Sequence, residues 1–190
     1  MKELVHEIDT IIPLSPEEKE RIGHFFSPKV IQKNSFLIKE GQYCNEVFFV
    51  KRGMLRVYYS DNNGDEITCY FSRNNEFISS YTSFLTQTPT KENIQALEDC
   101  KLFSINRANL EDLSQEIPKI QIFRRVIAEN LFIAMERRIS MLQSATAQER
   151  YERIIKENPK YILNIPQQYI ASFLGITPQH LSRLRKKITR

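Results

Sequence analysis

The segment from Gln167 to Lys186, QQYIASFLGITPQHLSRLRK, holds the side chains whose types and spacing could most directly recognise a ligand. Its apolar residues fall on one face of each of two short helices, with Gly175 between them. Ala171 is small enough to let the helices cross closely, and a glycine at position 175 permits a left-handed turn. The spacing predicts a helix-turn-helix. Its inner positions are Ile170, Ala171, Leu174, Ile176, Leu181, Leu184 and Ile188.

The second of these helices offers polar side chains to a DNA major groove. Thr177 is expected as its N-cap and Pro178 as its first residue. A glutamine pairs with adenine, and an arginine with guanine, through two hydrogen bonds that discriminate bases by about 1–3 kcal/mol. Arg183 is therefore the leading candidate for a base contact. The full set of predicted base contacts is Gln179, His180, Ser182 and Arg183.

Phosphate contacts, which fix the register of a protein on DNA without distinguishing bases, are expected from neighbouring side chains. For His180, a base and a phosphate remain alternatives. The whole motif has an alternative as well, because a helix-turn-helix can serve only in packing or protein contact. The predicted phosphate contacts are Gln168, Thr177, Lys186 and Lys187.

The charge of the chain is divided unequally along its length. The net charge is +4, yet residues 1–118 hold 13 Lys and Arg against 18 Asp and Glu, whereas residues 119–190 hold 14 against 5. No acidic residue follows Glu157. A one-sided basic region in a folded chain indicates contact with a polyanion, although a solvated basic tail is an alternative.

Other chemistry finds little support. The three cysteines, Cys44, Cys69 and Cys100, lie far apart without a neighbouring histidine, so buried reduced thiols are expected in place of a metal site. Phosphate-binding glycine loops and nucleophile-base pairs are missing from the sequence. We expect no enzyme, no metal and no cofactor.

The elements that must position the motif come before it. Helices are expected over residues 2–12 and 15–26, the second capped by Ser15. Short β-rich runs between turn signals then favour a compact antiparallel barrel or roll, with a hairpin turn at Asp61–Asp65. The expected strands cover residues 35–38, 46–50, 54–59, 66–71, 76–78, 94–97 and 101–105.

A long helix is predicted from Lys119 to about Gln143. Three- and four-residue steps give one apolar face at residues 120, 123, 127, 131, 135, 139 and 142, and a second at 122, 126, 133 and 141. One face is expected to cover the roll, and the other to meet a second copy in a parallel dimer. Burial of both faces within one chain is the alternative. Thr146 and Glu149 then form a capping box that opens a new helix.

These patterns predict three parts, namely a sensor roll at 1–118, a dimerisation helix at 119–143 and a DNA-binding domain at 144–190. The fold class is α+β, with an antiparallel β-roll of cupin or jelly-roll type. The 190 residues, 41% of them hydrophobic, suffice for a packed core. Apolar runs are too short for a membrane helix, and the N-terminus lacks a signal core, so a cytoplasmic location is expected.

The order of a roll, a long helix and a helix-turn-helix resembles the Crp/Fnr family of bacterial transcription regulators. FLIKEGQYCNEVFFVKRGMLRVYYSDNNGDEITCYF is similar to the cyclic-nucleotide-binding roll of the family, and IASFLGITPQHLSRLRKK is most similar to members from Bacteroidetes-type bacteria. The resemblance implies a homodimer on twofold double-stranded DNA and contact with RNA polymerase. It places two recognition helices about 34 Å apart. Either a small-molecule effector occupies the roll, or the protein is regulated by its amount.

The resemblance also locates an effector pocket, and this chain differs from the cyclic-AMP-binding members at the key positions of that pocket. Where cyclic-AMP-binding members carry a Gly-Glu pair and, ten residues later, an Arg-Ser or Arg-Thr pair, this chain has Ser79-Ser80 and Thr90-Lys91. Lys91 supplies a point charge but not the two-pronged fit of arginine. The adenine-contacting helix positions fall on Met135 and Glu136. Cyclic AMP is therefore not expected to bind in the family manner.

The residues that hold an iron-sulfur cluster or a haem in other members of the family are also missing from this sequence. No cysteine precedes Cys44, and the histidines stand only at positions 6, 24 and 180, so neither an iron-sulfur cluster nor a histidine-bound haem is expected. The chain stops two residues after Ile188, so we expect no full β-hairpin wing. A sequence-specific DNA-binding regulator is the favoured function. A ligand-binding or protein-interaction module without a DNA role is the alternative.

Overall fold

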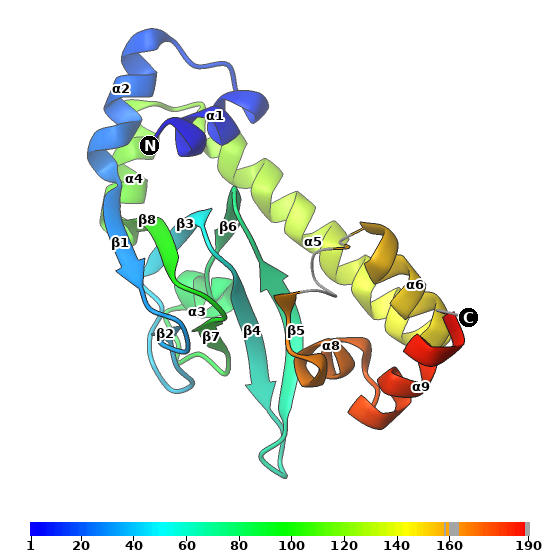
Figure 1. Cartoon of the computed structure of the whole chain (residues 1–190). Helices are drawn as coiled ribbons and strands as arrows, with labels where there is room; N and C mark the ends of the chain where they lie inside the picture. Colours follow the sequence, from blue (N-terminus) through cyan, green and yellow to red (C-terminus); the bar gives the residue numbers. More distant parts are fainter. Residues whose placement is uncertain (158, 160–163, 189–190) are drawn as a thin grey trace. The chain divides into compact units, whose positions relative to one another are not determined.

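The computed structural model describes residues 1–157, 159 and 164–188, which form two compact units (Figure 1). The first unit comprises Met1–Val57 and Phe71–Asn130, and the second comprises Tyr58–Tyr70 and the chain from Leu131 onward. The long helix therefore contributes to both units, and a hairpin from the roll belongs with the C-terminal segment. The three-part division at residues 118 and 143 remains a prediction.

Two four-stranded sheets account for the strands in the described part of the chain, and they confirm the predicted antiparallel roll. The first sheet has the order β1-β8-β3-β6 and the second β2-β7-β4-β5. Strand β8 is central in the first, pairing with both β1 and β3. The strands are β1 (Ser27–Ile31), β2 (Phe36–Ile38), β3 (Glu46–Arg52), β4 (Leu55–Ser60), β5 (Glu66–Ser72), β6 (Glu76–Ile78), β7 (Asn93–Ala96) and β8 (Cys100–Asn106).

Helices α1 (Lys2–Ile11), α2 (Pro16–Phe25), α4 (Arg107–Glu116) and the first turns of α5 (Ile120–Ser144) pack together in the first unit. Helix α2 begins as expected, since the Ser15 hydroxyl accepts the Glu18 backbone N–H and the Glu18 carboxylate accepts that of Ser15. The aromatic rings of Phe49 and Phe77 join this core to the sheet. The core comprises Leu4, Ile8, Ile12, Leu14, Ile22, Phe26, Phe49, Ile105, Leu113, Ile117, Ile120 and Phe123.

Three elements differ from the sequence-based expectation. Strand β1, helix α3 (Tyr81–Thr86) and helix α4 were not among the predicted elements. The α3 segment YTSFLT lacks a helical apolar period and is rich in residues that favour strands. Helix α4 did carry a usable signal, because the Asn106 side chain accepts the backbone N–H of Asn109 as an N-cap.

The second unit contains the C-terminal part of α5, then α6 (Ala147–Glu157), α8 (Gln167–Leu174) and α9 (Pro178–Ile188). The predicted capping box at Thr146 is confirmed, since Thr146 and Glu149 exchange backbone and side-chain hydrogen bonds. A small separate core joins these helices. It is formed by Tyr151, Ile154, Ile165, Ile170, Ala171, Leu174, Leu181 and Leu184.

The apolar face predicted for the long helix is buried only over its first turns in the single chain, and its pairing with a second copy stays a prediction. Ile120 and Phe123 are buried, whereas Met135, Ile139 and Leu142 on the same predicted face are exposed. Phe132, which was absent from both predicted faces, is the most exposed large apolar side chain of α5, at 71%. Within the described ranges, no helix has an apolar stretch long enough to cross a membrane.

Candidate nucleic-acid interface and effector roll

The turn between α8 and α9 has the geometry that the sequence predicted. Gly175 adopts φ +67°, in the left-handed region. The backbone N–H of Ile176 donates to the Ala171 carbonyl, and that of Gly175 donates to the Ser172 carbonyl, at 3.0 Å each. This hydrogen-bonded turn ends α8 and fixes the direction in which α9 begins.

Thr177 caps the first turn of α9. Its hydroxyl oxygen accepts the backbone N–H of His180 at 3.2 Å, and its carbonyl accepts that of Leu181 at 3.0 Å. Because a hydroxyl also carries one hydrogen, the exposed Thr177 side chain retains a donor that a phosphate oxygen can accept. Leu181 and Leu184 are buried on the inner face of the helix.

The opposite face of α9 carries the predicted DNA contacts. Gln179, Arg183 and Lys186 follow steps of four and three residues, so they form one stripe, and all three are exposed. Ser182 lies in the same stripe and is partly exposed, as is His180 at its margin. Gln168 on α8 is exposed too. Lys187 is exposed and donates to the Gln148 side-chain oxygen at 3.3 Å.

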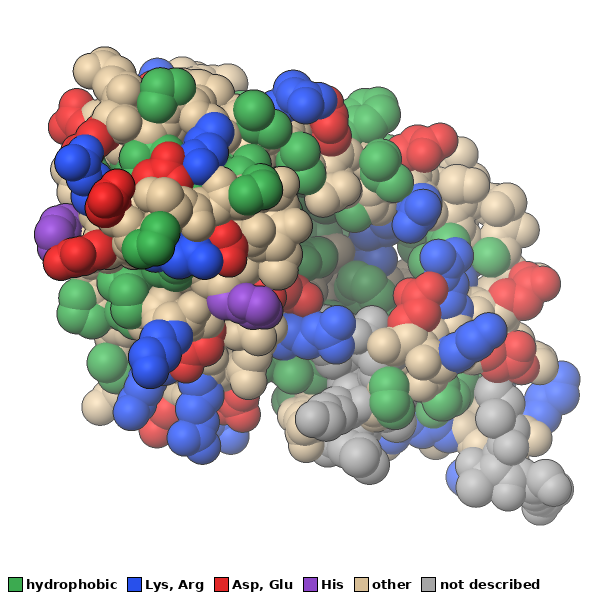
Figure 2. All heavy atoms as spheres, turned by 90° about the horizontal axis from the view of Figure 1, so that it is seen from above, with side chains coloured by type: hydrophobic (Ala, Val, Ile, Leu, Met, Phe, Trp, Pro, Cys, Tyr) green, Lys and Arg blue, Asp and Glu red, His purple; other side chains and the backbone are tan. Residues whose placement is uncertain are grey.

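The charged side chains of α9 are all basic. The helix contains no acidic residue, and its last turn carries Arg185, Lys186 and Lys187. In contrast, the visible face of the N-terminal unit carries acidic and basic side chains interspersed (Figure 2). A phosphate backbone that lies along the last turns of α9 would therefore meet only positively charged side chains.

Two arginines and one serine that the sequence reasoning did not single out hold α8 in place. Arg138 of α5 donates to the Phe173 carbonyl at 3.0 Å, and Arg150 of α6 donates to the Leu174 carbonyl at 2.9 Å. Ser172 donates to the Glu66 carbonyl of β5 at 2.7 Å. Sequence offered only a weak signal for them, because their partners are distant backbone carbonyls that no local pattern identifies.

The predicted effector residues of the roll differ in how far their side chains are exposed to solvent. Ser80 and Thr90 are 1% and 4% exposed, and their hydroxyls are hydrogen-bonded to each other at 2.7 Å. Thr90 also accepts the Glu92 backbone N–H at 2.9 Å. Lys91 is exposed. We call the Ser80–Thr90 pair the hydroxyl clasp. It joins the two ends of the segment that the sequence resemblance identifies with the cyclic-phosphate site of the Crp/Fnr family.

Ser79 is engaged in the wall of the roll. Its hydroxyl donates to the Glu46 carbonyl at 2.9 Å and lies 3.3 Å from the Cys44 sulfur. Met135 and Glu136 are exposed on α5 in the second unit. The contribution of these two helix residues to an effector pocket remains a prediction.

Arg56 is a charged residue of the roll that the sequence reasoning missed. It lies on β4, its side chain is fully buried, and it donates to the Gln95 side-chain oxygen at 2.8 Å. Strand alternation gave no warning, because Leu55, Arg56 and Val57 are all buried. The interior of the roll therefore contains a guanidinium from β4, outside the segment in which the family resemblance locates the effector pocket.

The cysteines differ among themselves. Cys44 and Cys100 are buried, as expected, but Cys69 is partly exposed. Burial raises the pKa of the Cys100 thiol to about 11, which keeps it protonated and unreactive at neutral pH. Across the residues that the structure describes, no three His, Cys, Asp or Glu side chains are arranged to hold a metal ion.

Comparison with known proteins places these units in a family. Residues 28–116 match the cyclic nucleotide-binding domain. The anaerobic regulatory protein of Haemophilus influenzae is 25% identical over 185 residues, covering 90% of this chain and 70% of the relative. FixK2 from Bradyrhizobium japonicum has the same fold, with a TM-score of 0.76 at 16% identity over 86% of this chain and 84% of its own.

A transcriptional regulator of the Crp/Fnr family from Eubacterium rectale aligns with a TM-score of 0.71 at 17% identity, over 95% of this chain and 88% of its own. The chain therefore carries a cyclic nucleotide-binding domain and is similar, over nearly its whole length, to regulators of the Crp/Fnr type, as its sequence resemblance indicated.

Replacing Thr90 by valine tests the hydroxyl clasp. The variant keeps the shape of the side chain but leaves the Ser80 hydroxyl and the Glu92 backbone N–H without their shared partner. We expect the free energy of unfolding to fall by about 1–3 kcal/mol. Urea denaturation measures this loss. The exposed Thr88→Val variant is the control and should stay within about 0.5 kcal/mol of the wild type. Equal stability of both variants would contradict the clasp.

Proposed function

We propose that the protein is a homodimeric, sequence-specific DNA-binding regulator. The observation that carries this proposal is the exposed stripe of Gln179, Arg183 and Lys186 on α9, directly opposite the buried Leu181 and Leu184. A helix with one buried face and one exposed face of this composition fits a major groove, where glutamine and arginine have matching base edges.

The assignment of roles follows from position on the motif. Gln179, His180, Ser182 and Arg183 contact base edges, while Gln168, Thr177, Lys186 and Lys187 contact phosphates. The capped geometry of Thr177 supports its role, because its exposed hydroxyl accepts the His180 backbone N–H and still carries a hydrogen that a phosphate oxygen can accept. The uniform positive charge of α9 supports the lysine roles.

The dimer rests on the exposed apolar side chains of α5. Phe132, Met135, Ile139 and Leu142 are separated by three, four and three residues, which is the spacing of alternating a and d positions in a coiled coil. We call these four residues the α5 stripe. Four large apolar side chains in one row are stabilised by burial against a second copy, and a parallel pair of α5 helices provides it.

The roll acts as a sensor that does not take cyclic AMP in the family manner. The hydroxyl clasp supports this, because Ser80 and Thr90 already satisfy each other where the family places a glutamate and an arginine. The effector is a different small molecule, and the protein acts in the cytoplasm with RNA polymerase as a partner. Calorimetric titration with cyclic AMP should show no binding at millimolar concentration. Saturable binding that Thr90→Val removes would contradict the proposal.

Replacing Arg183 by alanine tests DNA binding. Duplexes selected by the wild type from a random library supply the probe. We expect Arg183→Ala to lose about 1–3 kcal/mol of binding to the selected sequence and to relax its base preference. Lys186→Ala should weaken binding to all sequences alike and reduce the salt dependence by about one unit.

Arg153→Ala is the control for this experiment, because Arg153 is an exposed arginine on α6 that is paired with Glu157. It should bind the selected duplex like the wild type. A selection that enriches no sequence, or an Arg183→Ala variant that binds as well as the wild type, favours an interaction module without a DNA role.

Replacing Phe132 by glutamate tests the dimer. A carboxylate within a buried apolar interface is costly, so the variant should be monomeric at concentrations at which the wild type is dimeric. Sedimentation equilibrium measures the mass. Ser140→Glu adds the same charge at an exposed position away from the α5 stripe and should remain dimeric. A dimeric Phe132→Glu protein would place the interface elsewhere.

A further inference from the structure

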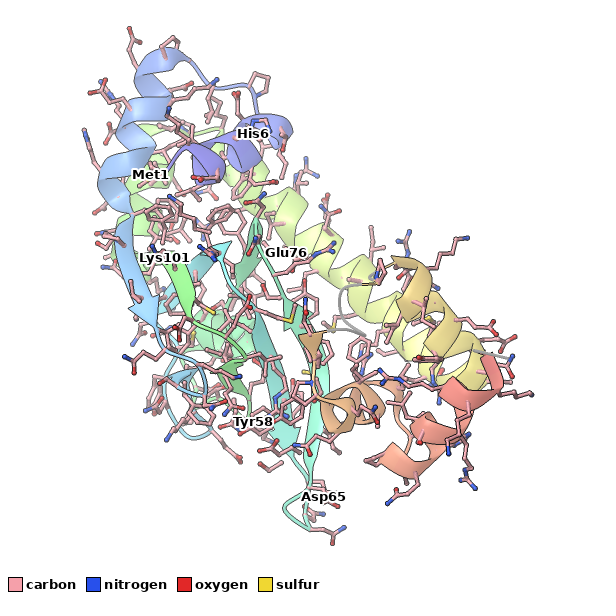
Figure 3. The ribbon with its side chains drawn as sticks, viewed as in Figure 1. Met1, His6, Tyr58, Asp65, Glu76 and Lys101 are labelled. Atoms are coloured by element: carbon pink, nitrogen blue, oxygen red, sulfur yellow. The ribbon has the colours of Figure 1, made fainter. Side chains whose placement is uncertain are left out.

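The hairpin between β4 and β5 is bonded to the helix-turn-helix through main-chain groups. Figure 3 shows Asp65 at the tip of this hairpin, whose residues Tyr58–Tyr70 belong to the second unit. The Ser172 hydroxyl of α8 donates to the Glu66 carbonyl at 2.7 Å and accepts the Thr68 backbone N–H at 2.8 Å. Strand β5 is an edge of its sheet, so one serine hydroxyl occupies the place of a neighbouring strand.

Arg138 completes the connection from the long helix. Its terminal nitrogen Nη2 donates both to the Thr68 carbonyl at 3.2 Å and to the Phe173 carbonyl at 3.0 Å. The guanidinium also stacks on the Phe173 ring, 4.0 Å from its centroid. Both polar groups of the Thr68 main chain are therefore bonded, one to α8 and one to α5. Burial lowers the pKa of Arg138 from its ordinary value, as expected for a guanidinium enclosed between three elements.

We propose that Ser172 and Arg138 are positioning residues, which use the hairpin as a clamp to fix the helix-turn-helix on α5. This inference rests on the proposed DNA binding. A regulator that binds twofold DNA must hold its two recognition helices at one separation, about one turn of the double helix. Helix α9 follows α8 through the hydrogen-bonded turn at Gly175, so the orientation of α8 on α5 sets the position of α9 in each protomer.

Unlike a base contact, the clamp should control the preferred spacing between half-sites and not the affinity for one half-site. Neither Ser172 nor Arg138 lies on the exposed stripe of α9, so neither is expected to touch a base. Removing the Ser172 hydroxyl breaks the two direct hydrogen bonds between the hairpin and α8, leaves the bridge through Arg138, and does not alter the predicted DNA contacts. The affinity of one recognition helix for one half-site should then remain, while the preference for one spacing between half-sites should weaken.

Binding of Ser172→Ala to three kinds of duplex tests the clamp. The duplexes carry the selected twofold site, the same site with one or two base pairs inserted at its centre, and a single half-site. We expect Ser172→Ala to bind the selected site about fivefold to tenfold more weakly than the wild type, with unchanged binding to the half-site and a reduced penalty for the insertions. Ser172→Thr, which keeps the hydroxyl, should restore the spacing preference.

Ser144→Ala is the matched control, because the Ser144 hydroxyl donates only within α5, to the Ser140 carbonyl. It should keep the wild-type spacing profile. If Ser172→Ala keeps that profile too, or loses affinity equally for all three duplexes, the clamp is not a positioning device.

Amide hydrogen exchange tests the clamp without DNA. In the wild type the Thr68 amide should exchange slowly, and in Ser172→Ala it should exchange at least fivefold faster, because its acceptor is gone. A Thr68 amide that exchanges rapidly in the wild type would overturn the inference. Wild-type protein that shows slow Thr68 exchange but selects no DNA would instead overturn the proposed function alone.

Discussion

The carbonyl groups at the end of α8 must find hydrogen-bond donors, and the second unit is arranged around this requirement. A helix leaves its last carbonyls without partners in its own backbone, and a short helix such as α8 exposes a large share of them. The chain supplies Arg138 from α5 and Arg150 from α6, whose positive charges also suit the negative end of a helix dipole. Because Arg150 also donates to the Ala145 carbonyl, one side chain joins the ends of α5 and α8. The position of α9 depends on these bonds.

The helix-turn-helix could be predicted from sequence because its determinants are local. A glycine with positive φ, a capping threonine and leucines at helical spacing each act within a few residues, and all three have the expected geometry. Arg138, Ser172 and Arg56 could not be found in this way. Their partners are backbone or side-chain groups 35 to 106 residues away, and the sequence pattern around each fits an exposed residue equally well. Phe132 was missed for a related reason, since α5 is buried only near its start, so its later apolar residues need not continue the same face.

The roll shows how a binding fold can keep its shape after its ligand groups change. A glutamate and an arginine at positions 80 and 90 would have to be satisfied by a ligand or by each other at the cost of burying two charges. Two hydroxyls in the same positions satisfy each other at 2.7 Å with no charge to bury. These two positions are therefore satisfied within the chain, without a bound phosphate. The buried guanidinium of Arg56, which donates to Gln95, is a charged group of the same roll that lies outside this segment.

The spacing of the α5 stripe has a geometric consequence for a pair of such helices. Alternating steps of three and four residues repeat every 3.5 residues on average, whereas a straight α-helix needs about 3.6 residues per turn. A row with this repeat drifts around the helix by about 20° in every seven residues. Two copies that keep Phe132, Met135, Ile139 and Leu142 in contact must therefore wind around each other with a left-handed twist.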